Sequence, residues 1–340
     1  MSGEQMAENQ KFNPGLALLR SLMCFMVISC HFEHNTTGLL EICIRSLRGS
    51  AVPVFMLMSF VLMQKSLKEH DKQKMKLRFE RLIIPLVGWA IIYWVLYFFF
   101  PSVGNLESRV TIREIFIQIF LGHSDILNPP MWYQTVLIWL TAIFLCIICI
   151  TGKYYRWVLG ALAIIALFIQ YSGLNIALFG NLSDEFKWTF GWFFEMVPIA
   201  VTGFLIAESG ILNKLKEHRV ISLVSAFGLG VAARVLRPWL SCDGYGYHGI
   251  CKIIAAVAIF VIFYLLPTEY LNPRIKKFIG IITKYTMGIY AMHMLVGRII
   301  SKWLTVDDLI ICILIYVVCY IIAFFGEKLT FKTKFKYLFE

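Results

Sequence analysis

Long apolar stretches recur along the whole chain, with only short polar segments between them. A stretch of roughly 17–25 apolar residues can cross the hydrocarbon core of a bilayer as a helix that satisfies its own backbone hydrogen bonds. With 59% hydrophobic and only 16% charged residues, the sequence predicts an all-α fold, a polytopic integral membrane helix bundle of about ten transmembrane helices. The predicted spans are 15–32, 50–64, 82–100, 131–150, 156–172, 189–207, 220–236, 250–266, 279–299 and 308–326.

The distribution of basic residues predicts the orientation of this bundle. Segment 65–81, KSLKEHDKQKMKLRFER, carries seven Lys and Arg residues against three acidic ones, and cytoplasmic loops are enriched in Lys and Arg. The segment is therefore predicted to be cytoplasmic, and an even number of spans then places both termini in the cytoplasm. The net charge of +11 reflects this topology, and a nucleic-acid partner is not expected because no soluble basic domain is present to bind one.

The chain is predicted to form one domain embedded in the lipid bilayer. Residues 1–14 are expected to be a cytoplasmic amino-terminal tail, 15–326 the transmembrane domain, and 327–340 a basic cytoplasmic carboxyl-terminal tail. The longest predicted loop, 101–130, is expected outside, where its helical spacing of apolar residues is typical of an interfacial helix. No internal repeat is evident, so the sequence does not favour a transporter built from two halves.

Arg20 and His31 are unusual because they lie in the apolar run LALLRSLMCFMVISCHF. Ionisable residues inside a membrane span are costly and are functional candidates by default. A separation of eleven residues is three helical turns plus about 20°, so both side chains lie on nearly one face, about 16 Å apart along the helix. A neutral histidine can take a proton from a hydroxyl, and an arginine can bind phosphate or stabilise an oxyanion. Alternatively, the two residues simply reach the inner and outer interfaces.

Further candidates lie in later spans. Arg78 and Arg81 are three residues apart at the inner start of the third span, so they can bind one polyanion together or simply follow the distribution of positive charge. His293 is predicted at the depth of His31 and facing the same cavity, and Tyr290, one turn away, can orient it by a hydrogen bond; a structural histidine is the alternative.

Glu195 is buried in the sixth predicted span, where a carboxylate needs a partner. Arg234 is the preferred partner, and Lys284 is the alternative. Trp132 begins the fourth span on the outer side, as an interfacial aromatic residue or as a platform for a sugar. The Cys-x-x-Cys pair at positions 146 and 149 lies on an apolar helix without other ligands, so no metal site is expected.

Several of these segments resemble, in order, the motifs of membrane acyltransferase family 3, of the bacterial polysaccharide O-acetyltransferase type. RSLMCFMVISCHF resembles the family's Arg-x10-His signature, and AVPVFMLMSFVL its second-span motif. The remaining matches, over about residues 15–300, are RFERLIIP, MWYQTVLIWL, VTGFLIAE and YTMGIYAMH. One departure is Phe60, which follows Ser59 where the family usually has glycine and which removes the close backbone approach that glycine permits. Ser59 can instead bond back to a carbonyl of its own helix.

The resemblance implies a membrane O-acyltransferase that moves an acetyl or short acyl group from cytoplasmic acyl-coenzyme A to a hydroxyl of a surface polysaccharide or its lipid-linked precursor. It also implies a multi-pass protein of a bacterial inner or plasma membrane, with acetyl-coenzyme A as donor. Two alternatives stay open. One is a transporter or lipid-linked sugar flippase, and the other is an enzyme of the same family that acylates a lipid, a peptidoglycan sugar or a small glycoside.

The resemblance also implies roles for particular residues. His31 is expected to act as the general base or as a transient acyl carrier, and Arg20 to stabilise developing charge or to position the thioester. Arg78 and Arg81 are expected to hold the coenzyme. His293 is expected to act with His31, and the supporting residues are Ser59, Glu195, Tyr290 and Trp132.

Overall fold

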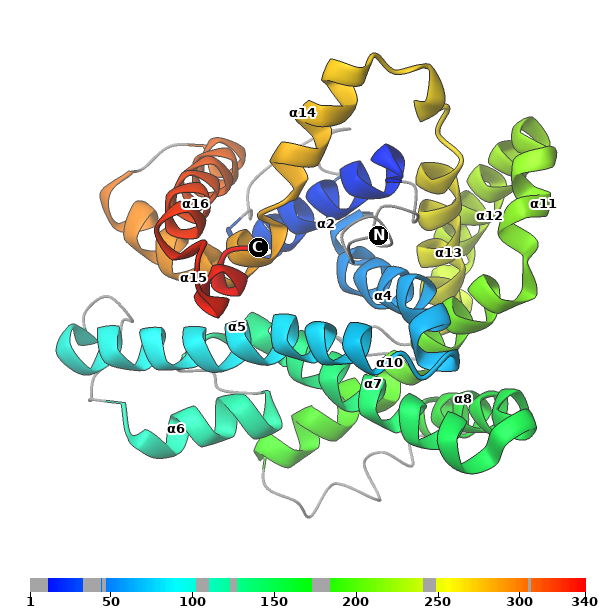
Figure 1. The fold of residues 1–340 in the computed structure, drawn as a ribbon, viewed down its shortest axis with the longest axis horizontal. Helices are drawn as coiled ribbons and strands as arrows, with labels where there is room; N and C mark the ends of the chain where they lie inside the picture. Colours follow the sequence, from blue (N-terminus) through cyan, green and yellow to red (C-terminus); the bar gives the residue numbers. More distant parts are fainter. Residues whose placement is uncertain are drawn as a thin grey trace.

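The computed structural model describes residues 12–32, 44, 47–101, 110–122, 127–172, 184–240, 249–304 and 307–340; residues 1–11, most of the predicted amino-terminal tail, lie outside the described residues. The described segments form helices and no strand, which confirms the predicted all-α class. In the view of Figure 1, α5 lies between α2, α4 and α14–α16 on one side and α6–α8 on the other. The helices are α2 (Pro14–Phe32), α4 (Ala51–Lys68), α5 (Lys72–Phe99), α6 (Ile112–Phe116), α7 (Trp132–Thr151), α8 (Tyr155–Tyr171), α10 (Asp184–Ser209), α11 (Ile211–Glu217), α12 (Arg219–Leu240), α13 (Ile250–Tyr264), α14 (Pro273–Thr283), α15 (Thr286–Trp303) and α16 (Asp308–Thr330).

Among the described residues, eight helical stretches are long and apolar enough to span a bilayer, or nine if the bent pair α14 and α15 forms one span. One of the eight is the 43-residue stretch Pro129–Tyr171, which contains both α7 and α8. A straight helix of that length would be about 65 Å long, roughly twice the hydrocarbon core. Gly152, with φ +51°, ends α7 and starts the short turn that leads into α8. The structure therefore divides this stretch close to where the sequence predicted a loop between two spans.

The ninth predicted span, 279–299, is corrected by the structure. It is a pair of helices, α14 and α15, which meet at an angle of 46°. Lys284 and Tyr285 lie at the junction, between the end of α14 and the start of α15. A bend at this point was not expected, because neither a proline nor a glycine interrupts the sequence there.

The predicted loop 65–81 is also corrected, since most of it is helical. α4 continues to Lys68, and α5 begins at Lys72. Asp71 caps α5 by accepting a hydrogen bond from the backbone N–H of Lys74 at 3.0 Å. This hydrogen bond and that from the Lys74 ammonium hold the pKa of the Asp71 carboxyl below its ordinary value. Arg78 and Arg81 therefore lie inside α5, on a regular helical surface.

Ion pairs connect helix ends and loops that the predicted topology places on the same side of the membrane. Glu208 at the end of α10 contacts Lys68 of α4 at 3.2 Å and Arg156 of α8 at 3.1 Å. Arg219, at the start of α12, contacts Glu269, which follows α13. Lys284 contacts Glu327 of α16 at 2.7 Å and Glu340 at 3.3 Å, and Lys334 contacts Glu80 of α5 at 2.5 Å. Each of these contacts lies between segments that the predicted topology places on the same side, and the assignment of that side to the cytoplasm stays a prediction.

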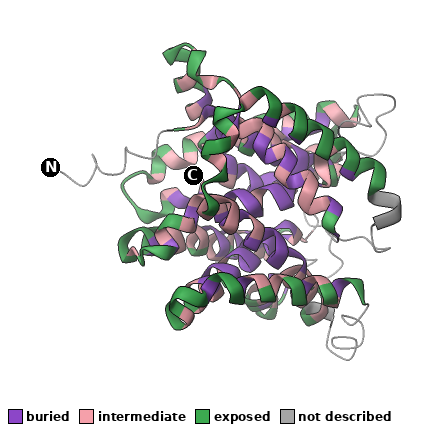
Figure 2. Cartoon of the chain, turned by 90° about the vertical axis from the view of Figure 1, so that its right-hand side faces the viewer, coloured by how far each residue is buried: buried purple, intermediate pink, exposed green. Residues whose placement is uncertain are grey.

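Helices α4 and α10 approach each other closely. At Gly203 of α10, an added Cβ would lie 2.5 Å from the carbonyl oxygen of Leu57 of α4, so no larger residue fits. Small residues of this kind let membrane helices approach closely. Buried residues concentrate in the middle of the bundle and exposed ones lie on the outer helices, as Figure 2 shows. The close approach of α4 and α10 is thus part of the buried interior of the bundle.

Candidate active site

A cavity of about 570 Å³, called here the inner cavity, opens between α2, α4, α5, α7, α15 and the carboxyl-terminal residues. It brings Arg20 of α2 together with Arg78 and Arg81 of α5. Lys284, which lies between α14 and α15, also lines it. Glu340 also lines the cavity and pairs with Lys284, so the three arginines are the groups that favour an anionic ligand such as a phosphate. The lining residues are Arg20, Phe55, Met58, Ser59, Leu62, Arg78, Arg81, Leu82, Tyr133, Gln134, Leu137, Lys284, Thr286, Met287, Tyr290, Tyr337 and Glu340.

Arg78 is fixed in this cavity by a hydrogen bond to the backbone. Its Nη2 donates to the carbonyl oxygen of Ser59 at 3.1 Å. Its Nε is buried and has no hydrogen-bond partner among the described residues. A buried donor that lacks a partner is costly, and an anion in the cavity can satisfy it.

The position of Phe60 explains how the chain accommodates this departure from the family motif. The Phe60 ring is fully buried and packs against Phe144 of α7, with ring centroids 4.4 Å apart. It is not among the residues that line the inner cavity. Ser59 does line it, and its hydroxyl lies 3.3 Å from that of Tyr133. The phenylalanine therefore fills the helix interface and leaves Ser59 accessible from the cavity.

A second cavity of about 280 Å³, the outer cavity, contains His31 and Trp132. Trp132 stacks on Trp192, with ring centroids 4.4 Å apart and an angle of 23° between the rings. The ring centroids of Trp188 and Trp192 are 5.4 Å apart. Flat aromatic surfaces beside a few polar groups are typical of sites for small ligands. The lining residues are Val27, Cys30, His31, Arg48, Val52, Pro129, Pro130, Trp132, Trp188, Trp192 and Tyr290.

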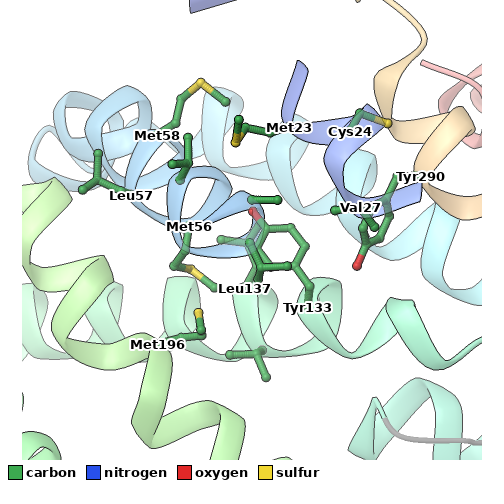
Figure 3. Packing of buried hydrophobic residues seen from close by; sticks show 14 of the residues in the cluster. Met23, Cys24, Val27, Met56, Leu57, Met58, Tyr133, Leu137, Met196 and Tyr290 are labelled. Atoms are coloured by element: carbon green, nitrogen blue, oxygen red, sulfur yellow. The ribbon is translucent and has the colours of Figure 1, made fainter. Parts of the chain in front are cut away.

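Tyr290 lines both cavities, so it lies at the boundary between them. Its hydroxyl donates a hydrogen bond to the carbonyl oxygen of Pro130. Its ring lies 6.0 Å from that of Tyr133, and Figure 3 shows the two rings beside the apolar core of α2, α4 and α7. Arg20 therefore faces one cavity and His31 the other, with Tyr290 between them.

His293 lies directly behind His31. The centroids of the two imidazole rings are 5.4 Å apart, and the His293 side chain is fully buried. Its Nδ1 lies 2.5 Å from the carbonyl oxygen of Tyr290. Because a carbonyl only accepts, Nδ1 carries the hydrogen and Nε2 the lone pair in the neutral ring. Nε2 is buried without a hydrogen-bond partner among the described residues. Tyr290 thus orients His293 through its backbone, whereas the sequence pointed to its side chain.

Two buried residues that sequence reasoning missed hold the helical turn around His293. Tyr93 of α5 donates a hydrogen bond to the carbonyl oxygen of Ala291 at 2.9 Å and accepts one from the N–H of Leu295 at 3.1 Å. These are the two backbone groups that a regular α-helix joins directly. The side-chain amide of Asn128 also donates to the Ala291 oxygen, at 2.9 Å. Both contacts bridge distant parts of the chain, and no local spacing in the sequence signals them.

Glu195 and its predicted partners lie in different surroundings. Glu195 is buried in α10, whereas Arg234 is exposed on α12, and the ion pair between them stays a prediction. Lys284, the alternative partner, contacts Glu327 and Glu340.

The sequence matches a known protein family, described as an acyltransferase domain, over residues 13–326. The chain belongs to acyltransferase family 3. It is therefore a multi-pass membrane acyltransferase. No curated protein and no solved structure matches the chain. An acyltransferase uses a donor and an acceptor, and the two cavities that meet at Tyr290 offer a separate site for each.

Membership of this family weighs against the alternative of a transporter or flippase. The family match ends at residue 326, so the cavity residues Tyr337 and Glu340 lie beyond it.

Proposed function

We propose that this protein is an O-acetyltransferase of a bacterial inner or plasma membrane. It takes an acetyl or short acyl group from cytoplasmic acyl-coenzyme A and transfers it to a hydroxyl of a surface polysaccharide or its lipid-linked precursor. The observation that carries the proposal is the pair of cavities that share Tyr290, with a cluster of basic residues in one and His31 in the other.

The inner cavity suits the donor. Coenzyme A carries a pyrophosphate and a 3'-phosphate, and these groups are proposed to bind Arg78 and Arg81 through charge-assisted hydrogen bonds. Arg78 is already oriented by Ser59 and keeps a buried Nε for the ligand. The pantetheine arm then runs past Arg20 toward Tyr290, so that the thioester reaches the boundary between the cavities.

The outer cavity suits a sugar acceptor. The stacked rings of Trp132 and Trp192 present an aromatic wall against which a sugar ring can pack. His31 lies in the same cavity, where it can contact a hydroxyl of that sugar. An acceptor hydroxyl at this position can reach the thioester beside Tyr290, while the rest of the coenzyme stays in the inner cavity.

The proposed chemistry is a single acyl transfer. His31 takes the proton of the acceptor hydroxyl while the hydroxyl oxygen attacks the thioester carbonyl carbon. The new C–O bond forms, the C–S bond breaks, and the coenzyme thiolate takes up the proton and leaves as the thiol. Arg20 stabilises the negative charge that develops on the carbonyl oxygen. His293, whose ring centroid lies 5.4 Å from that of His31, supports the imidazolium that forms on His31.

The test is transfer of labelled acetyl groups from acetyl-coenzyme A by purified protein in lipid vesicles, with membrane polysaccharide as acceptor. The wild-type protein should release coenzyme A thiol and label the polymer, and His31→Ala should reduce both by about 10²-fold or more. His218→Ala is the matched control, because His218 is exposed at the end of α11 and lines neither cavity. Transfer at the normal level by His31→Ala, or no transfer by the wild type, would overturn the proposal.

A further inference from the structure

Residues 331–340 pack against the bundle, where the sequence predicted only a basic tail. After α16 the chain turns back and forms a short helix, η6 (Lys334–Leu338), against α5. Tyr337 and Leu338 are buried. The segment lies outside the part of the chain that matches the family.

Three kinds of contact hold this segment in place. The indole Nε1 of Trp89 donates a hydrogen bond to the carbonyl oxygen of Leu338 at 2.9 Å. Lys334 forms an ion pair with Glu80 of α5 at 2.5 Å. Phe339 packs so closely on Gly288 that an added Cβ there would lie 2.6 Å from the Phe339 carbonyl oxygen. The segment is thus a fixed wall of the inner cavity.

Tyr337 is the residue through which this wall meets the basic cluster. The Arg81 guanidinium lies over the Tyr337 ring, 5.5 Å from its centroid. Both residues line the inner cavity. Arg81 itself is exposed, and a long exposed arginine samples many rotamers unless something holds it. The face of a buried aromatic ring attracts the guanidinium and restricts it.

We propose that the carboxyl-terminal segment is part of the donor site, and that Tyr337 is a positioning residue which holds Arg81 toward the phosphates of acyl-coenzyme A. This inference rests on the proposed function, since it takes acyl-coenzyme A as the donor. The tyrosine acts through Arg81, so its contribution appears only with a donor that carries phosphates.

The experiment compares two donors in vesicles that contain the full-length protein. Acetyl-coenzyme A carries the phosphates, and acetyl-pantetheine has the same thioester and arm without them. Tyr337→Ala should raise KM for acetyl-coenzyme A about threefold to tenfold and leave kcat unchanged. It should leave KM for acetyl-pantetheine unchanged. Tyr337→Phe keeps the ring and should restore the wild-type KM.

Phe335→Ala is the matched control, because Phe335 lies in the same segment, is 62% exposed and does not line the cavity. An equal change of KM with both donors would mean a purely structural role and would overturn the inference, as would an unchanged KM in Tyr337→Ala. These results leave the proposed function intact, because that function is tested by acetyl transfer in the wild-type protein and in His31→Ala, and neither measurement involves Tyr337.

Discussion

The imidazole rings of His31 and His293 lie with their centroids 5.4 Å apart, on helices α2 and α15. His31 reaches the outer cavity, whereas His293 is fully buried behind it. We expect the two histidines to act as one unit, since their rings are neighbours and the buried Nε2 of His293 has no hydrogen-bond partner among the described residues. His31→Ala and His293→Ala should each lower kcat strongly, and the double variant should be no slower than the slower single one.

The measurement is the initial rate of transfer from acetyl-coenzyme A at saturating donor, for the two single variants and the double variant. If the decrease in log kcat of the double variant equals the sum of the decreases in the two single variants, the histidines act independently. Thermal unfolding of each purified variant serves as the control for folding.

The second prediction concerns binding of the coenzyme. Arg78→Ala combined with Arg81→Ala removes two cationic side chains of the inner cavity. The Kd for coenzyme A should rise by at least about tenfold, because each charge-assisted hydrogen bond contributes about 1.5–3 kcal/mol. Calorimetric titration of purified protein measures this loss. Lys72→Ala combined with Lys76→Ala removes the same charge from exposed positions of α5 that do not line the cavity, and should bind normally. Equal weakening in both pairs would indicate a general effect of charge.

The third prediction concerns the contact between α4 and α10. Gly203→Leu places a side chain where the Leu57 backbone lies, so it should destabilise the protein by about 1–3 kcal/mol or more. The unfolding midpoint in detergent should fall accordingly. Gly160→Leu is the control, because no heavy atom lies within 4 Å of a Cβ added at Gly160 in α8. If both variants unfold at the same temperature as the wild type, the close approach of these helices does not contribute to stability.

The sequence predicts those features that depend on local periodicity. The apolar runs predict the helices and the fold class, because in lipid each span must form its own backbone hydrogen bonds as a helix. The eleven-residue spacing of Arg20 and His31 places both on one face of α2, and the structure finds them in adjoining cavities. Arg78 and Arg81 likewise reach one cavity because they are three residues apart on a helix.

Features that depend on contacts between distant segments were beyond sequence reasoning. The bend between α14 and α15, which places Lys284 at the inner cavity, has no proline or glycine at its position. Tyr337 appears in the sequence as part of a basic tail, and only its packing against α5 brings it under Arg81. The same holds for Tyr93, whose hydroxyl contacts a helix that follows it by about 200 residues.

The last prediction follows from this contact of Tyr93. Its hydroxyl donates a hydrogen bond to the carbonyl oxygen of Ala291 and accepts one from the N–H of Leu295, and so fixes the part of α15 that carries His293 to α5. In Tyr93→Phe both hydrogen bonds are lost, so this part of α15 is no longer fixed to α5 and His293 is expected to shift relative to His31. Since a displacement of about 1 Å can cost 10²-fold in rate, we expect kcat to fall about 10- to 100-fold, with KM for acetyl-coenzyme A unchanged.

Tyr97→Phe is the matched control for this variant, because Tyr97 is also a buried tyrosine of α5, one turn away. Its hydroxyl accepts a hydrogen bond from the Arg298 side chain at 2.6 Å and is not bonded to the α15 backbone. The ring that remains in Tyr97→Phe still lies under the Arg298 guanidinium, so this variant should keep kcat within about twofold of the wild type. If the two variants lose the same activity, or if Tyr93→Phe raises KM and leaves kcat unchanged, Tyr93 does not position His293.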